Sequence, residues 1–190
     1  MSERRSGRGW TRHRIGMRRK SLATALFCVA VLAALPVGAA TSAPIKLAFF
    51  DFELEDVSAA ASSAGVSPSD AEQMAQITEE VRRLFVQSGR YDLVDVGAAD
   101  EAPAKSHTLR DCRGCDAGIA LKLGAEQSFV GVVRRVSRTE HVVMFRVRDA
   151  RTGAIVADAN SGLRLGAVDA WRRGVVRLVK DRLLASPPPQ

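Results

Sequence analysis

Two cysteines, Cys112 and Cys115, are the residues whose types and spacing point most directly to chemistry. They form a C-x-x-C pair where we predict the start of a short helix, and in an oxidising compartment two nearby thiols normally close. The first interpretation is therefore a structural disulfide. The second is thiol–disulfide exchange, because a helix N-terminus favours the thiolate form of a cysteine such as Cys112. Metal binding needs two further ligands, and outside the N-terminal segment only His107 and His141 are available.

Four acidic residues form a second candidate site, a binding lip made of Asp51, Glu53, Glu55 and Asp56. They end the first predicted strand, and open α/β sheets place their ligand crevices beyond the carboxyl ends of their strands. If the chain stays extended, Asp51, Glu53 and Glu55 share one face and could bind a cation or a basic surface of a partner. The plainer interpretation is a solvated acidic edge. Replacing Asp51 and Glu53 by amides should then change stability by less than about 1 kcal/mol.

Catalytic and cofactor-binding motifs are missing from the sequence. It contains no G-x-S-x-G elbow, phosphate-binding glycine loop, H-E-x-x-H motif or dinucleotide fingerprint. Covalent haem attachment is excluded because Asp116 follows Cys115, where a histidine is required. We expect a protein that is not an enzyme and that holds no metal or other cofactor.

The N-terminal segment has the pattern of an export signal. Residues 4–20 carry eight arginines and lysines, and the apolar run 22–35 that follows leads to the small residues Gly38, Ala39 and Ala40. A membrane-spanning helix needs about 20 apolar residues, and this run is shorter. We predict a signal peptide over residues 1–40, cleaved after Ala39 or Ala40, and a periplasmic or secreted product. The alternative is an uncleaved leader that anchors the chain to the inner membrane.

The net charge of the chain comes from the leader alone. The sequence holds 28 Lys and Arg against 21 Asp and Glu, and residues 1–40 account for eight of those bases and one acid, so twenty of each remain. The basic composition therefore gives no reason to expect nucleic-acid binding, and we expect membrane contact only through the leader during export. Residues 41–109 are acidic and residues 110–190 basic. This asymmetry either orients a partner or is neutralised where the two halves meet in the fold.

Hydrophobic periodicity predicts one domain over residues 41–186, followed by a proline-rich tail, residues 187–190. The clearest helix begins at Ser67 as N-cap with Pro68 in its first turn, and it ends at Gly89. A second helix is capped by Asp111. The predicted elements are strand 45–52, helix 67–88, strand 91–96, helix 111–123, strands 127–136, 141–147 and 154–160, and helix 167–184, with a surface loop over 97–107.

This order predicts the α/β class with a mixed sheet. Each early strand–helix–strand unit requires parallel pairing, whereas the short turns near residues 137–140 and 149–153 require antiparallel pairing. We therefore expect the order β-α-β-α-β-β-β-α, with a five-stranded mixed sheet and three helices.

Three segments carry a resemblance to known proteins. IKLAFFDFELED at 45–56, SGRYDLVD at 88–95 and DCRGCDAGIALKLGAEQSFVG at 111–131 together resemble a family of secreted bacterial proteins known only as a domain of unknown function. More distantly, the strand, the helix ending in SGR and the LGA before a further strand are similar to the N-terminal domain of the Tol-system β-propeller protein and to the curli-secretion-channel family. The resemblance implies an extracytoplasmic α/β module that contacts other envelope proteins, and it does not imply catalysis.

The sequence thus predicts an exported, non-catalytic protein-interaction module of the cell envelope, with an envelope protein as partner. The alternative function is that of a thiol–disulfide redox accessory protein that uses Cys112 and Cys115.

Overall fold

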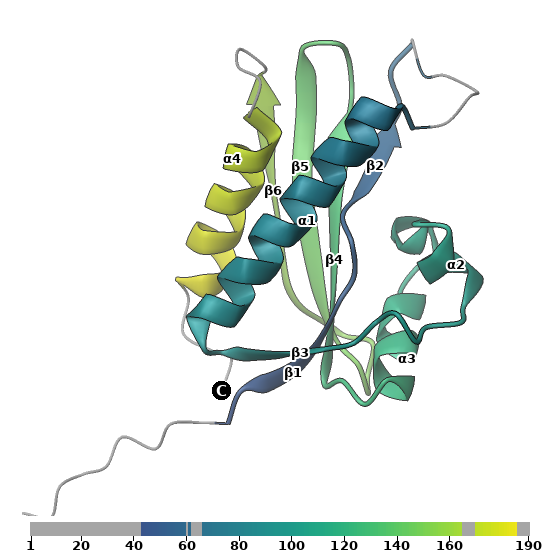
Figure 1. The fold of residues 1–190 in the computed structure, drawn as a ribbon, viewed down its shortest axis with the longest axis vertical. Helices are drawn as coiled ribbons and strands as arrows, with labels where there is room; N and C mark the ends of the chain where they lie inside the picture. Colours follow the sequence, from purple (N-terminus) through teal and green to yellow (C-terminus); the bar gives the residue numbers. More distant parts are fainter. Residues whose placement is uncertain (1–42, 60, 62–65, 165–169, 186–190) are drawn as a thin grey trace, which may run out of the picture. The chain divides into compact units, whose positions relative to one another are not determined.

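The computed structural model describes residues 43–59, 61, 66–164 and 170–185, all within the compact unit Thr41–Gln190. They form a mixed sheet flanked by helices (Figure 1). The strands are β1 (Ile45–Phe49), β2 (Glu53–Asp56), β3 (Tyr91–Val94), β4 (Gln127–Arg135), β5 (Glu140–Asp149) and β6 (Ile155–Arg164). The helices are α1 (Pro68–Ser88), α2 (Ala102–Lys105), α3 (Cys115–Lys122) and α4 (Ala170–Val179), with a 3₁₀ turn η1 (Leu109–Asp111) and a π-helical turn η2 (Lys180–Leu184).

The predicted fold class is confirmed. The strand order is β3-β1-β4-β5-β6, with parallel pairing of β1 to β3 and to β4 and antiparallel pairing of β5 to β4 and to β6. The predicted counts are wrong, because the described residues form six strands and four α-helices. A short helix, α2, lies in the predicted loop 97–107. The predicted first strand, 45–52, already ends at Phe49, and β2 is a further strand that begins after the predicted end; both pair with β4.

An extra residue separates β1 from β2. Phe49 lies beside Phe129 and Glu53 lies beside Val132, so this segment uses one more residue than β4 over the same length. The close approach of Phe52 to Gly131 explains the irregularity, since a Cβ atom at Gly131 would lie 2.3 Å from the Phe52 ring. The ring occupies the space that a side chain on β4 would need.

Helix α1 forms as its sequence predicts. Ser67 is the N-cap and its hydroxyl accepts a hydrogen bond from the Asp70 N–H, Pro68 lies in the first turn, and Gly89 adopts the left-handed conformation with φ 64°. The buried apolar residues of this helix recur at helical spacing and face the sheet: Met74, Ile77, Val81 and Phe85.

Helices cover the two faces of the sheet unequally. On one face α1 and α4 lie side by side (Figure 1) over the larger core, where the Phe129 ring stacks on Phe49 and Phe145. On the other face α3 and η1 cover a smaller cluster around Phe50 and Ile119. Beyond that cluster, side chains on this second face of β5 and β6 are exposed, and they include Arg146, Asp158 and Asn160. We call this region the open face.

Several predicted boundaries are corrected. The second helix is not capped by Asp111, which belongs to η1; it begins at Cys115 with Gly114 as N-cap. Strand β6 is longer than predicted, because its pairing with β5 continues to Arg164. The last helix is described from Ala170, and its predicted first turn, like the proline-rich tail and the leader, lies outside the described residues. Among the helices described, none has both the length and the apolar character needed to cross a membrane.

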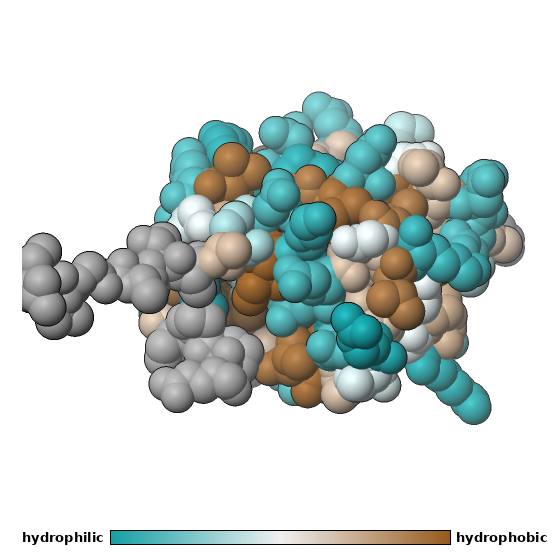
Figure 2. Space-filling view, turned by 90° about the horizontal axis from the view of Figure 1, so that it is seen from below, coloured by the Kyte–Doolittle hydropathy of each residue, from teal (hydrophilic) through white to brown (hydrophobic). Residues whose placement is uncertain are grey.

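The surface seen in Figure 2 carries hydrophobic residues in separate patches among hydrophilic ones. Over the described residues, the exposed large hydrophobic side chains are Val57, Val66, Val86, Leu121, Val136, Ile155 and Val156. Isolated apolar side chains are normal on protein surfaces and do not by themselves mark a binding site.

Candidate functional site

The four acidic residues of the predicted lip do not share one face. Asp51 precedes β2, and its carboxylate lies 3.4 Å from the Arg82 guanidinium of α1. Along β2, Glu53 and Glu55 point to the side of η1, whereas Asp56 points to the side of α1. The interruption between β1 and β2 thus removes Asp51 from the face that Glu53 and Glu55 share.

Glu53 is buried, which contradicts the solvated acidic edge. Its side chain is 1% exposed. One carboxylate oxygen accepts a hydrogen bond from the Leu109 N–H at 2.6 Å, and the other accepts from the Arg110 N–H at 3.2 Å and from the Arg110 guanidinium at 3.0 Å. A buried carboxylate is tolerated when it is paired and fully hydrogen-bonded. Glu53 therefore anchors η1 to β2.

The other two acids pair with arginines of β4. The Arg134 guanidinium lies 2.6 Å from Glu55 and the Arg135 guanidinium 2.9 Å from Asp56, as the parallel register of β2 and β4 requires. Arg135 also contacts Asp70 at the start of α1. Hydrogen bonds from the Ser58 hydroxyl and N–H, together with Arg135, hold the pKa of Asp56 below its usual range. These carboxylates are fixed by partners within the domain.

Cys112 and Cys115 form a disulfide with an S–S distance of 2.10 Å. Cys112 follows η1 and Cys115 begins α3, so the bridge closes the turn between the two elements. Both cysteines pack at the edge of the smaller core cluster. Between them, Arg113 and Gly114 have positive φ angles of 54° and 105°, so the turn places an exposed arginine in a strained conformation.

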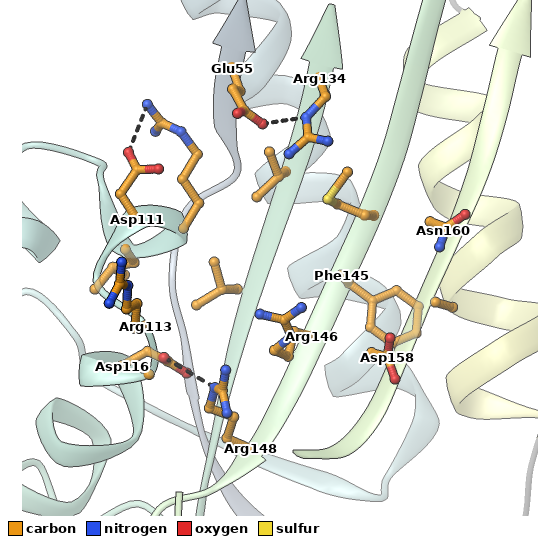
Figure 3. Close-up of a pocket in the computed structure, with 17 residues that line it drawn as sticks. Glu55, Asp111, Arg113, Asp116, Arg134, Phe145, Arg146, Arg148, Asp158 and Asn160 are labelled. Carbon is orange, nitrogen blue, oxygen red and sulfur yellow. Dashed lines mark hydrogen bonds and ion pairs between the residues drawn. The ribbon is translucent and has the colours of Figure 1, made fainter. Parts of the chain in front are cut away.

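A hollow of about 200 Å³ lies on the open face beside this turn (Figure 3). Side chains from β2, η1, the turn before α3, and strands β4, β5 and β6 line it. Its charged residues are Glu55, Arg110, Asp111, Arg113, Asp116, Arg134, Arg146, Arg148 and Asp158. Its floor is apolar and includes Val130, Val132 and Met144. Such a mixture of apolar floor and charged rim is typical of a protein-binding surface.

One side of the hollow is built around buried Asp116. Its carboxylate accepts a hydrogen bond from the Ser128 hydroxyl at 2.5 Å and lies 3.6 Å from Nε of Arg148. Arg148 also donates to the Gly153 carbonyl at 2.9 Å and packs against Gly114, where a Cβ atom would lie 3.4 Å from the guanidinium carbon. These contacts hold the turn before α3 against β5.

The geometry tests the metal interpretation of the cysteines. Over that part of the chain no group of three or more His, Cys, Asp and Glu side chains could hold a metal ion. His141 packs against Trp171 on the α1 and α4 side of the sheet, whereas the disulfide lies on the other side. The metal interpretation of the cysteines, which required His107 and His141, therefore has no geometric support.

Sequence reasoning missed the arginines of the open face. Arg146 and Arg148 on β5 alternate with buried Phe145 and Val147, so both belong to the second face of the strand, and the register of β4 with β5 places Arg134 on the same face. Period-2 alternation of arginine with valine and phenylalanine was the available signal. The pairing of strands that brings these side chains to one hollow depends on register, which a single sequence does not reveal.

Several solved structures are similar to this chain in part. The C-terminal domain of LpoB from Salmonella enterica is 15% identical with a TM-score of 0.45, over 67% of this chain and 87% of that one. Lipoprotein GNA1162 from Neisseria meningitidis is 12% identical with a TM-score of 0.46, over 74% of this chain and 99% of that one. TolB from Acinetobacter baumannii is 12% identical with a TM-score of 0.36, over 73% of this chain and 28% of that one.

No curated protein matches the sequence. A family model does, and it covers residues 45–183, which include all three segments on which the resemblance was based. The predicted membership of a family with unknown function is thereby confirmed. The chain belongs to the DUF3280 family, described as "Protein of unknown function (DUF2380)".

Proposed function

We propose that this protein is exported by its leader, that the leader is removed after Ala39 or Ala40, and that the remaining domain is a non-catalytic protein-interaction module of the cell envelope. Its partner is an envelope protein, and it contacts the membrane only through the leader during export. The export signal in the sequence supports the location.

One observation supports the proposed interaction: the candidate acids and cysteines are bonded to partners within the domain, while side chains on the second face of β5 and β6 are exposed. The carboxylates of the acidic lip pair with arginines, and the two thiols are joined. Sheets that are helix-covered on both faces bury their side chains, whereas β5 and β6 expose Arg146, Asp158 and Asn160 beside an apolar floor. A partner surface can bury this region without any rearrangement of the core.

Two experiments test the proposal. N-terminal sequencing of the purified protein should find a first residue between Ala39 and Ala43, and recovery of the intact leader from membranes would show an anchored protein instead. A photocrosslinking residue at Arg146 should capture an envelope protein in cells, whereas the same residue at Arg83, on the exposed side of α1, should not. Equal capture from both positions, or capture from neither, would contradict an interface on the open face.

The redox accessory role remains a second candidate because of the exposure of the cysteine turn. Cys112 is only half-buried and Arg113 beside it is exposed, so a thiol partner could approach the bridge. A glutathione titration separates the two functions. Structural disulfides have potentials below about −300 mV, whereas a midpoint above about −250 mV would favour redox exchange. A mixed disulfide trapped in Cys115→Ser would support the same conclusion.

A further inference from the structure

Strand β2 has a neighbour in the sheet on one side only. Both β1 and β2 pair with the same edge of β4. Strand β1 also pairs with β3 on its other side, whereas among the described strands β2 pairs with β4 alone. In Figure 1, β3 runs beside β1 and does not continue beside β2. Over the described residues, the position next to the outer edge of β2 is therefore unoccupied by a strand.

The backbone at this edge is oriented to accept another strand. Val57 donates its N–H to the Arg135 carbonyl of β4, and successive residues of a strand point their backbone groups in opposite directions. The backbone groups of Leu54 and Asp56 consequently point away from β4. The N–H of Phe52, two residues before Leu54, also points away from β4, and it donates to the Thr78 hydroxyl of α1 at 2.9 Å. Over the described residues, helix α1 thus closes the edge at Phe52 and leaves it open from Leu54 onward.

A groove of about 570 Å³ lies beside residues 51–54 and meets the open edge at Leu54. Its volume lies within the range of about 300–1,000 Å³ that is usual for ligand sites. The wall formed by α1 is apolar toward the start of the helix, at Ala71, Met74 and Ala75, and polar farther along, at Thr78, Glu79 and Arg82. The opposite wall is polar and consists of Ser106, His107, Thr108 and Arg110. Glu53 holds this polar wall in place through its bonds to the Leu109 and Arg110 N–H groups, so the groove is already formed without a ligand.

The two walls determine which occupant fits. Side chains of an added strand would alternate between the two faces of the sheet, so apolar residues would meet α1 and polar residues would meet the opposite wall. At the closed end, Asp51 and Glu79 both contact the single guanidinium of Arg82, which leaves an excess negative charge there. A basic side chain in the occupant would complement it.

We propose that the outer edge of β2 binds an extended segment of a protein partner as an additional strand, with alternating apolar and polar residues and a Lys or Arg near Asp51. This inference rests on the proposed interaction function and names a surface distinct from the open face. Main-chain hydrogen bonds to Leu54 and Asp56 supply the affinity, and the two walls supply the specificity.

A proline at position 54 tests the main-chain bonds. Leu54→Pro removes an N–H that points away from β4, which an edge strand tolerates, while Leu54→Ala removes the same side-chain packing and keeps the N–H. The two variants should melt at similar temperatures. A photocrosslinking residue at Ala71 on one wall, or at Ser106 on the other, reports occupancy in cells. We expect about tenfold less crosslinked product from Leu54→Pro than from Leu54→Ala, because the partner carbonyl is left unpaired.

A second pair of variants keeps the test valid if Leu54→Pro does not fold. Ala75→Trp fills the groove from an exposed helix position, and Gln76→Trp places the same ring on the helix outside the groove. Crosslinking from Ser106 should be lost in the first variant and retained in the second. Peptide mapping should show that Ala71 and Ser106 label alternate residues of one partner segment.

Four outcomes would overturn the inference. Equal crosslinking by Leu54→Pro and Leu54→Ala, with equal crosslinking by the two tryptophan variants, would show that the edge is not used. Labelling of a second copy of this chain, or of its own residues, would exclude a separate partner. Capture from Arg146 without capture from either wall would reject the groove and leave the proposed function standing, whereas the absence of any captured protein would reject both.

Discussion

Removal of the Glu53 carboxylate should destabilise the domain more than removal of any other acid in the predicted lip. In Glu53→Ala, the N–H groups of Leu109 and Arg110 and the Arg110 guanidinium lose their acceptor. Hydrogen bonds to charged groups contribute about 1.5–3 kcal/mol each, but Arg110 is 22% exposed and can rehydrate its guanidinium. Loss of one partner of a buried ion pair costs about 3–5 kcal/mol. We expect a loss of about 3 kcal/mol for Glu53→Ala.

Urea unfolding of the purified protein measures this loss. With a slope of about 1–3 kcal/mol/M, the expected change lowers the midpoint by about 1–3 M. Glu53→Gln should lie between the wild type and Glu53→Ala, since the amide oxygen can still accept the Leu109 N–H while the amide nitrogen opposes Arg110. The matched control is Asp51→Asn. Asp51 is half-exposed and, among the described residues, pairs with Arg82, so this change should alter stability by about 0.5 kcal/mol or less. Equal losses of stability in Glu53→Ala and Asp51→Asn would refute the argument that burial of the carboxylate determines the size of the loss.

Three further changes have outcomes that the contacts predict. Burial and the nearby Arg135 lower the pKa of His141 below 6.5, although Asp56 and Asp70 oppose the shift, so stability should be full above pH 6.5 and fall as the pH drops below it. His141→Phe should remove this pH dependence in thermal unfolding between pH 5 and 7. Gly131→Ala should lower the free energy of unfolding in urea by about 1–3 kcal/mol because the added Cβ would overlap the Phe52 ring. Replacing both cysteines by serine should cost about 1–3 kcal/mol and leave partner capture intact, because the closed loop is short.

Local signals were sufficient for α1 and for the fold class. The Ser67 cap, Pro68 and Gly89 lie within the helix or next to it, and the structure places each in its predicted role. Likewise, the short turns between β4, β5 and β6 allow only antiparallel pairing. Properties that depend on neighbours in the sequence were therefore predictable from the sequence.

The acidic lip was not predictable because its partners are distant in the chain. The break after β1 depends on Gly131, and the burial of Glu53 depends on Leu109 and Arg110, more than fifty residues away. In the sequence, Asp51 and Glu53 look alike, because both are acids at the end of an apolar run and a single residue separates them. Only the position of η1 makes one of them a buried anchor and leaves the other half-exposed.

The charge asymmetry along the chain also finds its explanation in these contacts. Acids of the first half pair with arginines of the second: Glu53 with Arg110, Glu55 with Arg134, and both Asp56 and Asp70 with Arg135. The prediction that the two halves neutralise each other is thus confirmed for these residues. Arginines within the domain neutralise most of the acids around β2, so a basic partner can be attracted only by carboxylates that share one arginine. Asp51 and Glu79 share Arg82, and they lie at the closed end of the groove.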